Sequence, residues 1–469
     1  MNNAFSILFA AVLGLLLGWS ASTAAQSTYS PYSRFGMGEL QSGADAAQLG
    51  MGQMGAAWID RHHLNTRNPA MAAFLTRTTF SGGFQVRSES IMEGDSVDRG
   101  EVGGLTQVAF ALKRAGGKGA LTFGLQPWSN AGYDVSQVRT DDIADEYRIS
   151  YTGSGGLAQG HVGYARRWEG TRWNRFEDAS GTVVDSVRII AHGTAFGARL
   201  EQRFGSLVRA RTIDVANPVF LDTRVETTED HRSAGFTVGF GHERLLGARF
   251  DKDRKLVAST LLRVGGIGQL GRNHTINRNT RWASWQTLST GPLEVDSVHT
   301  ESATFALGLP LMWSAGFEIE RNATNGMRLR MGLEREQATW SVLSSDLLDP
   351  GATWVDAATT AFGAMLTPRN LEDAKTAWQR ATYQIGWRST TGIIALNDAP
   401  LQHTVWSAGW SLPMVGSRSG SSLNLAFQWR QLQSGDDPQG LREGGFGATV
   451  GFTLHPFFKN QWLVPRKYD

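Results

Sequence analysis

Residues 233–242 read Ser-Ala-Gly-Phe-Thr-Val-Gly-Phe-Gly-His, so that apolar and small side chains alternate along the stretch. A period of two places successive side chains on opposite faces and predicts a β-strand. Residues 327–334 and 445–454 repeat the pattern, with glycine, threonine, arginine or glutamate on the second face. Such a face does not suit the dry core of a sandwich. Strands with one apolar and one wet face, repeated along a chain, are typical of a β-barrel in lipid.

The orientation of these strands follows from residues 192–204, where Arg199, Glu201 and Arg203 share the face opposite Leu200. An arginine that faces lipid costs roughly 2–4 kcal/mol, so the charged face is expected to line the lumen. An open strand edge in lipid would leave backbone groups unpaired, so the barrel must close. The sequence therefore predicts an all-β fold, a transmembrane antiparallel β-barrel of about fourteen strands. A secreted β-sandwich or propeller is the alternative.

Strand candidates occur along the whole chain beyond residue 77, and the connections between them differ in length. The clearest candidates are residues 105–114, 120–126, 192–204, 233–242, 327–334, 405–412, 423–430 and 445–454. Four stretches without alternation are predicted to be long loops: residues 168–190, 206–232, 271–302 and 341–380.

Composition favours one large architecture, because no Pro/Ser-rich or acidic linker divides the 469 residues. The 55 glycines allow strands to pack closely and bend, and the 16 tryptophans suit a membrane–water interface. A net charge of +2 gives no support for nucleic-acid binding. The chain has no cysteine, which excludes disulfides, thiol catalysis and cysteine-based zinc sites.

The N-terminus has the features of a secretory signal. Residues 5–19 are apolar and residues 20–26 are mostly small, so a signal peptide is expected over residues 1–25, with a retained anchor as the alternative. Residues 26–76 then lack regular alternation and are rich in glycine, alanine and methionine. We interpret residues 26–76 as a hatch that plugs the lumen, and residues 77–469 as the barrel with a C-terminal tail.

Motifs of enzymes and cofactor sites lack their required context. Residues 50–55 match G-x-G-x-x-G, but no βαβ unit surrounds them. His62 and His63 have no third ligand at a telling spacing, and the acids of residues 141–146 lack the order of a calcium loop. A hydrolase would need a serine partner for His192, and none is evident. We therefore expect no enzyme activity, no cofactor and no metal.

Several segments resemble a known family. They include the Tyr-Ser-Arg-Phe-Gly start, a Met/Gly-rich stretch, an Asn-Pro-Ala motif, a Tyr-x-Gly-Ser-Gly-Gly-Leu strand and a basic tail, at residues 32–40, 49–55, 65–70, 151–157 and 457–469. This order is similar to FadL-like outer-membrane proteins, the long-chain fatty-acid transporter family, and closest to their Bacteroidetes-type branch. The implied topology covers the whole mature chain, whereas the motifs cover about a sixth of it.

The resemblance implies a fourteen-stranded barrel whose hatch rearranges so that hydrophobic cargo leaves sideways through the wall. Hatch residues expected near the ligand are Phe35, Met51, Met54, Asn68, Pro69 and Ala70. Pro127 interrupts an alternating segment and removes a ladder hydrogen bond, so a wall opening is expected there unless Pro127 only ends a strand.

The function implied by the resemblance is passive uptake of hydrophobic compounds such as long-chain fatty acids through the outer membrane of a Gram-negative cell. The alternative is a non-transporting barrel that acts as a scaffold or shuttle in protein secretion, because some relatives of that branch serve secretion. The expected partners are a hydrophobic small molecule and outer-membrane lipid or lipopolysaccharide, with secretion-system proteins under the alternative, and no nucleic acid.

Overall fold

The computed structural model describes residues 28–455, except 114–116, 142–144, 178–182, 218–219, 252, 255, 289–290, 345–347, 349–350, 370–373, 415–419 and 436–439. The expected signal peptide and the C-terminal tail lie outside the described residues. Among the described residues, no helix is long and apolar enough to cross a membrane.

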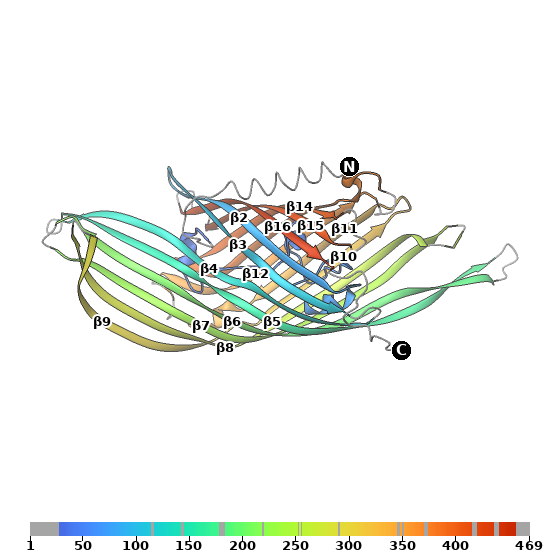
Figure 1. Ribbon diagram of the computed structural model, residues 1–469, viewed down its shortest axis with the longest axis horizontal. Helices are drawn as coiled ribbons and strands as arrows, with labels where there is room; N and C mark the ends of the chain where they lie inside the picture. The colour runs from blue at the N-terminus through green and yellow to red at the C-terminus, as the bar shows by residue number, and fades with distance from the viewer. Residues whose placement is uncertain are drawn as a thin grey trace, which may run out of the picture.

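Fourteen antiparallel strands, most of them labelled in Figure 1, pair in a closed ring, which confirms the predicted fold class. The first seven strands of the ring are β2 (Thr79–Glu93), β3 (Ser96–Lys113), β4 (Gly119–Asp141), β5 (Asp145–Glu177), β6 (Val183–Val215), β7 (Asp222–Phe250) and β8 (Leu256–Leu288). The other seven are β10 (Met312–Asn322), β11 (Arg328–Ala338), β12 (Ala352–Thr367), β13 (Thr382–Leu396), β14 (Ala399–Pro413), β15 (Ser422–Ser434) and β16 (Arg442–Leu454).

Each strand of the ring pairs with its neighbours in sequence, except where β9 (Gly291–Gly308) intervenes between β8 and β10. The ring closes where β16 pairs with β2. Strand β9 pairs with the second half of β8, while β10 pairs with the first half. We call the end of the barrel where β2 begins and β16 ends the terminal end. Two short helices lie in connections, η3 (Trp340–Val342) and α3 (Ala377–Arg380).

The outer and inner faces of the wall differ as the sequence predicted. On β6 the outward side chains of Phe196 and Leu200 are 54% and 61% exposed. Arg199, Glu201 and Arg203 point inward and are buried. The charged inner face is not open to water, however, because the N-terminal residues pack against it.

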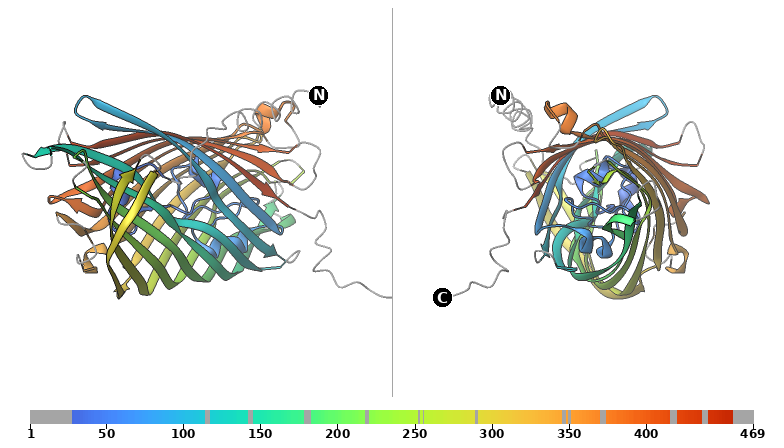
Figure 2. Two further views of the ribbon diagram at one scale, coloured as in Figure 1. Left: turned by 60° about the vertical axis from the view of Figure 1, so that its left-hand side comes forward. Right: turned by 90° about the vertical axis from the view of Figure 1, so that its right-hand side faces the viewer.

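Residues 28–78, which we call the N-terminal segment, lie inside the ring (Figure 2). The segment contains η1 (Pro31–Arg34), β1 (Glu39–Leu40), α2 (Ala46–Leu49) and η2 (Pro69–Phe74). Asp45 and Gln48 form a capping box at the start of α2, which satisfies backbone donors that are buried in the lumen. The segment therefore carries little regular structure but is fixed locally by its own side chains.

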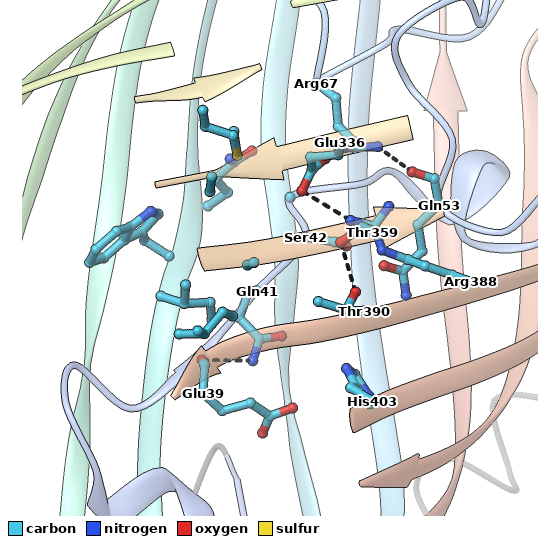
Figure 3. A pocket seen from close by; sticks show the side chains of 18 of the residues that line it. Glu39, Gln41, Ser42, Gln53, Arg67, Glu336, Thr359, Arg388, Thr390 and His403 are labelled. Carbon is cyan, nitrogen blue, oxygen red and sulfur yellow. Dashed lines mark hydrogen bonds and ion pairs between the residues drawn. The ribbon is translucent and has the colours of Figure 1, made fainter. Parts of the chain in front are cut away.

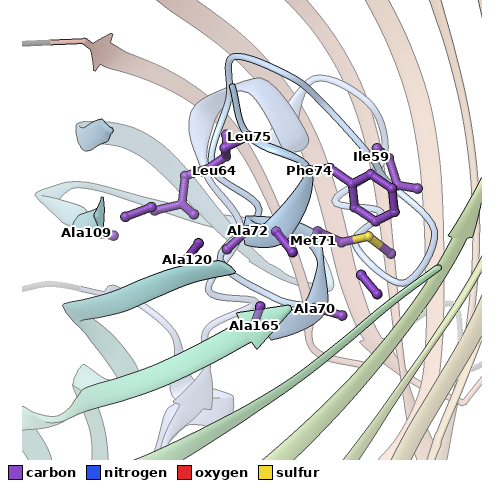
Figure 4. Packing of buried hydrophobic residues seen from close by; sticks show 13 residues of the cluster. Ile59, Leu64, Ala70, Met71, Ala72, Phe74, Leu75, Ala109, Ala120 and Ala165 are labelled. Carbon is purple, nitrogen blue, oxygen red and sulfur yellow. The ribbon is translucent and has the colours of Figure 1, made fainter. Parts of the chain in front are cut away.

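Small inward residues make room for η2 near the terminal end. Met71 and Phe74 pack against a ring of alanines from β3 to β6 (Figure 4). A Cβ added at Gly197 would lie 2.6 Å from the backbone nitrogen of Ala70. The small residues of the alternating strands thus serve close packing of the N-terminal segment.

The predicted long loops are wrong, because strands occupy most of them. β5, β6 and β8 each run for 33 residues, far beyond the roughly 9–11 that a transmembrane strand needs. Residues 206–232 belong to the β6–β7 ladder, residues 271–302 to the β8–β9 hairpin, residues 168–190 to the β5–β6 hairpin, and residues 341–380 contain β12. Beyond the membrane both faces of a strand can meet water, so apolar alternation disappears while main-chain pairing continues.

Candidate functional site

The ladder between β3 and β4 is short. It runs only from Lys113 paired with Ala120 to Val108 paired with Leu125. Both strands continue past this point, and β3 remains paired with β2 while β4 remains paired with β5. We call the space between β3 and β4 beyond the Val108–Leu125 pair the wall gap.

A β-bulge on each strand marks the start of the wall gap. Thr106 is the extra residue on β3, because Gly83 and Phe84 pair with Gln107 and Leu105. Trp128 is the extra residue on β4, directly after Pro127. A bulge bends its strand and increases the local twist, so two bulges at one level separate the strands.

Strand β1 of the N-terminal segment occupies part of the β4 edge that β3 has left. Glu39 pairs with Asn130 and Leu40 with Ser129. The backbone N–H of Gln41 then donates to the carbonyl of Trp128 at 2.9 Å. The inner side of the wall gap is therefore covered by the N-terminal segment, through strand addition.

A cavity of about 350 Å³ fills the wall gap. Its lining includes Leu105 of β3, Leu125 and Pro127 of β4, and Gly43 and Leu49 of the N-terminal segment. Leu105 is 64% exposed on the outer face of the barrel. Pro127 thus lies at the wall gap, and its role in opening the wall stays a prediction.

A second cavity, of about 280 Å³, lies in the lumen (Figure 3). It shares residues with the wall-gap cavity, namely Gln41, Ser42, Gly43, Leu49, Gln85, Arg87 and Gln126. One part of its lining is apolar and includes Leu40, Trp128, Leu309, Met312, Trp340 and Ile393. The other part is polar and includes Arg388, His403 and Arg430. The luminal cavity therefore has an amphipathic lining.

The polar wall of the luminal cavity contains donors without an acceptor in the described part of the chain. Arg388 Nη2 donates to Glu336 at 3.2 Å, whereas Arg388 Nη1 is buried without a partner. Arg430 Nη2 lies 3.7 Å from Glu443 Oε2 and makes no hydrogen bond. Buried unsatisfied donors cost free energy, so an acceptor that reached them would be stabilised.

Ion pairs fix the N-terminal segment to opposite sides of the ring. Glu39 pairs with Arg87 of β2 and Arg430 of β15. Burial opposes the ionisation of Glu39, but these two guanidinium groups outweigh it and hold the pKa of Glu39 well below its usual range. Arg61 pairs with Glu243 of β7. The segment is therefore held by ion pairs to several strands of the ring.

Glu334 of β11 is a further anchor of the N-terminal segment. One carboxylate oxygen accepts the backbone N–H groups of Gly55 and Ala56, both at 2.7 Å. The other oxygen accepts Arg67 Nη1 at 2.6 Å. Arg67 also pairs with Glu336. A single side chain thus satisfies three donors of the N-terminal segment.

Asn68 links the segment to β7 and β8. Its Oδ1 accepts from Ala70 at 3.0 Å and caps η2, while its Nδ2 contacts the carbonyl oxygens of Ala56, Phe240 and Gly266 at 2.7–3.2 Å. The Asn-Pro-Ala motif therefore shapes the segment by fixing where η2 begins.

Asn68→Ala is expected to destabilise the packing of η2 by about 2–4 kcal/mol, because it removes both the cap and the amide donor that contacts three carbonyl oxygens. Hydrogen exchange of the amides of residues 69–74 measures the loss. Asn68→Ser keeps the capping oxygen and should recover about 1 kcal/mol. Equal exchange in all three proteins would contradict the anchoring role.

The six hatch residues expected near a ligand line neither of the two cavities. Met51 and Met54 pack with Trp58, Ala361 and Met365, and Phe35 packs against a separate apolar cluster. Asn68, Pro69 and Ala70 lie at η2. Their contribution to ligand binding stays a prediction. Sequence reasoning missed the stretch that does line both cavities, residues 41–43, because it has no periodicity or motif.

His63 connects the N-terminal segment to β15. Its Nδ1 lies 3.2 Å from Asp60 Oδ1, and its Nε2 lies 2.9 Å from Ser422 Oγ. The Asp60–His63–Ser422 contacts resemble the triad of a serine hydrolase. However, Ser422 is buried and lines neither described cavity. Burial lowers the pKa of His63, yet Asp60 outweighs burial and raises it above its usual value.

Because its pKa is raised in the folded state, His63 contributes stability below about pH 6.5, and this contribution is lost as the pH rises through the folded-state pKa. We expect the advantage of wild type over His63→Gln in free energy of unfolding to be largest near pH 6 and to shrink towards pH 9. Denaturant titrations of both proteins across this range check it. A difference that grew with pH would contradict the sign.

No group of three or more potential ligands could hold a metal ion among the residues that the structure describes. The expected absence of a metal stays a prediction.

The ring and its filled lumen together define a transmembrane-type β-barrel whose own N-terminal residues pack inside it. The chain belongs to the BamG family, whose model matches residues 7–169 and 186–469. The resemblance to FadL-like proteins predicted the barrel fold correctly, whereas the family model that matches this chain is that of BamG.

Two solved structures are similar to this chain at low sequence identity. The P. putida toluene transporter TodX is 13% identical, with 88% of this chain and 99% of that chain covered and a TM-score of 0.50. A Pseudomonas aeruginosa FadL homologue is 12% identical, with 88% and 98% covered and a TM-score of 0.48. No curated protein sequence matches. The likeness to TodX supports the barrel fold.

Proposed function

We propose that this protein is a non-enzymatic outer-membrane channel of a Gram-negative cell that passes hydrophobic compounds between the luminal cavity and the lipid through the wall gap. The observation that carries this proposal is the continuity of lining between the two cavities, which share residues 41–43 of the N-terminal segment. The similarity to the structure of the toluene transporter TodX also supports a channel for hydrophobic compounds.

The route requires a small rearrangement of the N-terminal segment. β1 lies across the inner side of the wall gap and is held there by pairing with β4 and by Glu39. A hydrophobic molecule is not stabilised in a water-filled pore. A lateral exit into lipid is therefore more favourable for it than an open aqueous channel. Outer-membrane lipid or lipopolysaccharide would then be the medium that the cargo leaves or enters.

Long-chain fatty acids fit the amphipathic lining of the luminal cavity. The apolar part, with Leu40, Trp128 and Met312, would contact the chain. Arg388 Nη1 and Arg430 Nη2 would donate to a carboxylate. Charge-assisted hydrogen bonds of this kind are about twice as strong as neutral ones.

Uptake by liposomes tests the proposal. Vesicles that contain the purified protein should take up a labelled long-chain fatty acid or alkylbenzene faster than empty vesicles of the same lipid. A folded barrel, recognised by its different migration before and after boiling, is required for the comparison. Uptake no faster than that of empty vesicles would remove the main support for a channel.

A second candidate is a non-transporting barrel that serves protein secretion as a scaffold or shuttle. It is favoured by the buried ion pairs that fill the lumen, of which Arg67–Glu334 and Arg263–Glu320 are almost inaccessible to water. Stable copurification of secretion-system proteins, together with absence of uptake, would favour this second role over the channel.

A further inference from the structure

The β6–β7 ladder ends before either strand does. The last pair is His192 with Arg244, yet β6 starts further out, at Val183, and β7 continues to Phe250. Over these stretches β6 pairs with β5 and β7 with β8, so two hairpins project separately from the terminal end, at the right of Figure 1. We call the space between residues 183–191 and 245–250 the fork.

Paired bulges build the fork. Ala191 is the extra residue on β6, because Gly170 pairs with His192 and Thr171 with Ile190. Leu246 is the extra residue on β7, because Leu245 pairs with Leu261 and Gly247 with Thr260. Both bulges lie on the strands that face each other, directly beyond the last pair.

The wall gap has the same construction, with bulges at Thr106 and Trp128 on its two facing strands. There, the vacated edge of β4 is occupied by an extended segment, β1, through main-chain pairing. The wall gap therefore shows that an unpaired strand edge beside two bulges can bind an extended segment through main-chain pairing. At the fork, no described residue pairs with the corresponding edges.

The β5–β6 and β7–β8 hairpins, which border the fork, contact each other again near their tips. Asp185 and Arg254 form an ion pair across them, and the rings of Phe176 and Phe250 are 5.3 Å apart between centroids. The stretch of β6 that borders the fork, residues 183–191, is roughly 30 Å long at about 3.3 Å per residue. The two unpaired edges are thus held facing each other at both ends.

The side chains beside the edges combine apolar and basic character. Ile190 and Leu246 are 53% and 52% exposed. Arg188, Arg244 and Arg249 are also exposed beside them. A strand laid along either edge would therefore meet apolar contacts and positive charge.

We propose that the fork binds an extended, acidic and apolar polypeptide segment of another protein by strand addition. Main-chain hydrogen bonds would supply affinity, and alternate side chains would contact Ile190, Leu246 and the arginines. This site is separate from both cavities, so it stands or falls independently of the proposed channel.

A defined peptide tests this binding on the full-length protein in detergent. The probe is a fluorescein-labelled, end-blocked octapeptide of alternating valine and glutamate, followed by fluorescence anisotropy. We expect saturable binding, and we expect the Arg188→Glu/Arg249→Glu variant to bind roughly tenfold more weakly through charge repulsion. Hydrogen exchange should slow at residues 185–191 and 245–250 when the peptide is bound.

Three controls make the result specific. Arg139→Glu/Arg148→Glu makes the same charge change at exposed arginines of β4 and β5 at the opposite end of the barrel, and it should leave affinity unchanged. A peptide with alternate N-methylated amides cannot extend a ladder and should not bind. Unboiled migration on detergent gels reports whether each variant is folded.

Absence of binding by folded wild type at millimolar peptide would overturn the proposal. Equal affinity of the N-methylated peptide would overturn it too, since binding would then not use the strand edge. Binding of phosphatidylglycerol vesicles through Arg188 and Arg249, without peptide binding, would instead identify a lipid-contacting surface and likewise overturn it.

Discussion

Gly104→Trp is expected to reduce uptake of a hydrophobic compound at least roughly tenfold while leaving the barrel folded, because a buried indole occupies a large apolar area. Gly104 lines the wall gap and pairs with Gln85, whose side chain lines the luminal cavity. A Cβ built at Gly104 meets no atom within 4 Å. The added side chain therefore enters the space that cargo would have to cross.

Gly308→Trp is the matched control for this blockade. A Cβ at Gly308 also meets no atom within 4 Å, but Gly308 lies on β9 and lines neither cavity. Uptake by this variant should equal that of wild type in the same liposomes. Undiminished uptake by folded Gly104→Trp protein would show that the wall gap is not the route.

Glu334→Leu is expected to release the N-terminal segment from β11 at a cost of roughly 3–5 kcal/mol, as when one partner of a buried ion pair is removed. The change leaves the N–H groups of Gly55 and Ala56 without their acceptor, and it leaves Arg67 with Glu336 and the carbonyl of Gln53. In planar bilayers we expect frequent opening to ions, where wild type stays mostly closed.

Hydrogen exchange at Gly55 and Ala56 should accelerate in Glu334→Leu, in parallel with conductance. Glu226→Leu provides the control, since Glu226 and Arg224 form an exposed pair on β7. Exposed pairs contribute about 0–1 kcal/mol, so this variant should behave like wild type. Fast exchange without any change in conductance would mean that the segment can loosen and still block the pore.

The alternation at residues 233–242 predicted a strand correctly, and β7 contains it together with its inward and outward faces. This success has a physical basis, because lipid contact demands an apolar side chain at every second position. The same reasoning failed at residues 223–232, which β7 also contains. There the strand has left the membrane, so nothing in the solvent requires alternation.

The partners of Glu334 show what sequence reasoning could not reach. Arg67 lies 267 positions away in the chain, and the two backbone donors have no side-chain signature. The charges on the inner face indicated a polar lumen but did not indicate which ones neutralise each other. Residues 41–43 were missed as cavity lining for a similar reason, since their position depends on where β1 joins β4.

The luminal position of the N-terminal segment also constrains how the molecule can assemble. Trp58, Met51 and Phe74 are buried completely within a ring that is hydrogen-bonded all the way round. Side chains of that size cannot cross a wall that is hydrogen-bonded around the ring. The segment therefore either enters through an end of the barrel or is in position before the last strand, β16, meets β2. In the second case it would act as a template around which the wall forms.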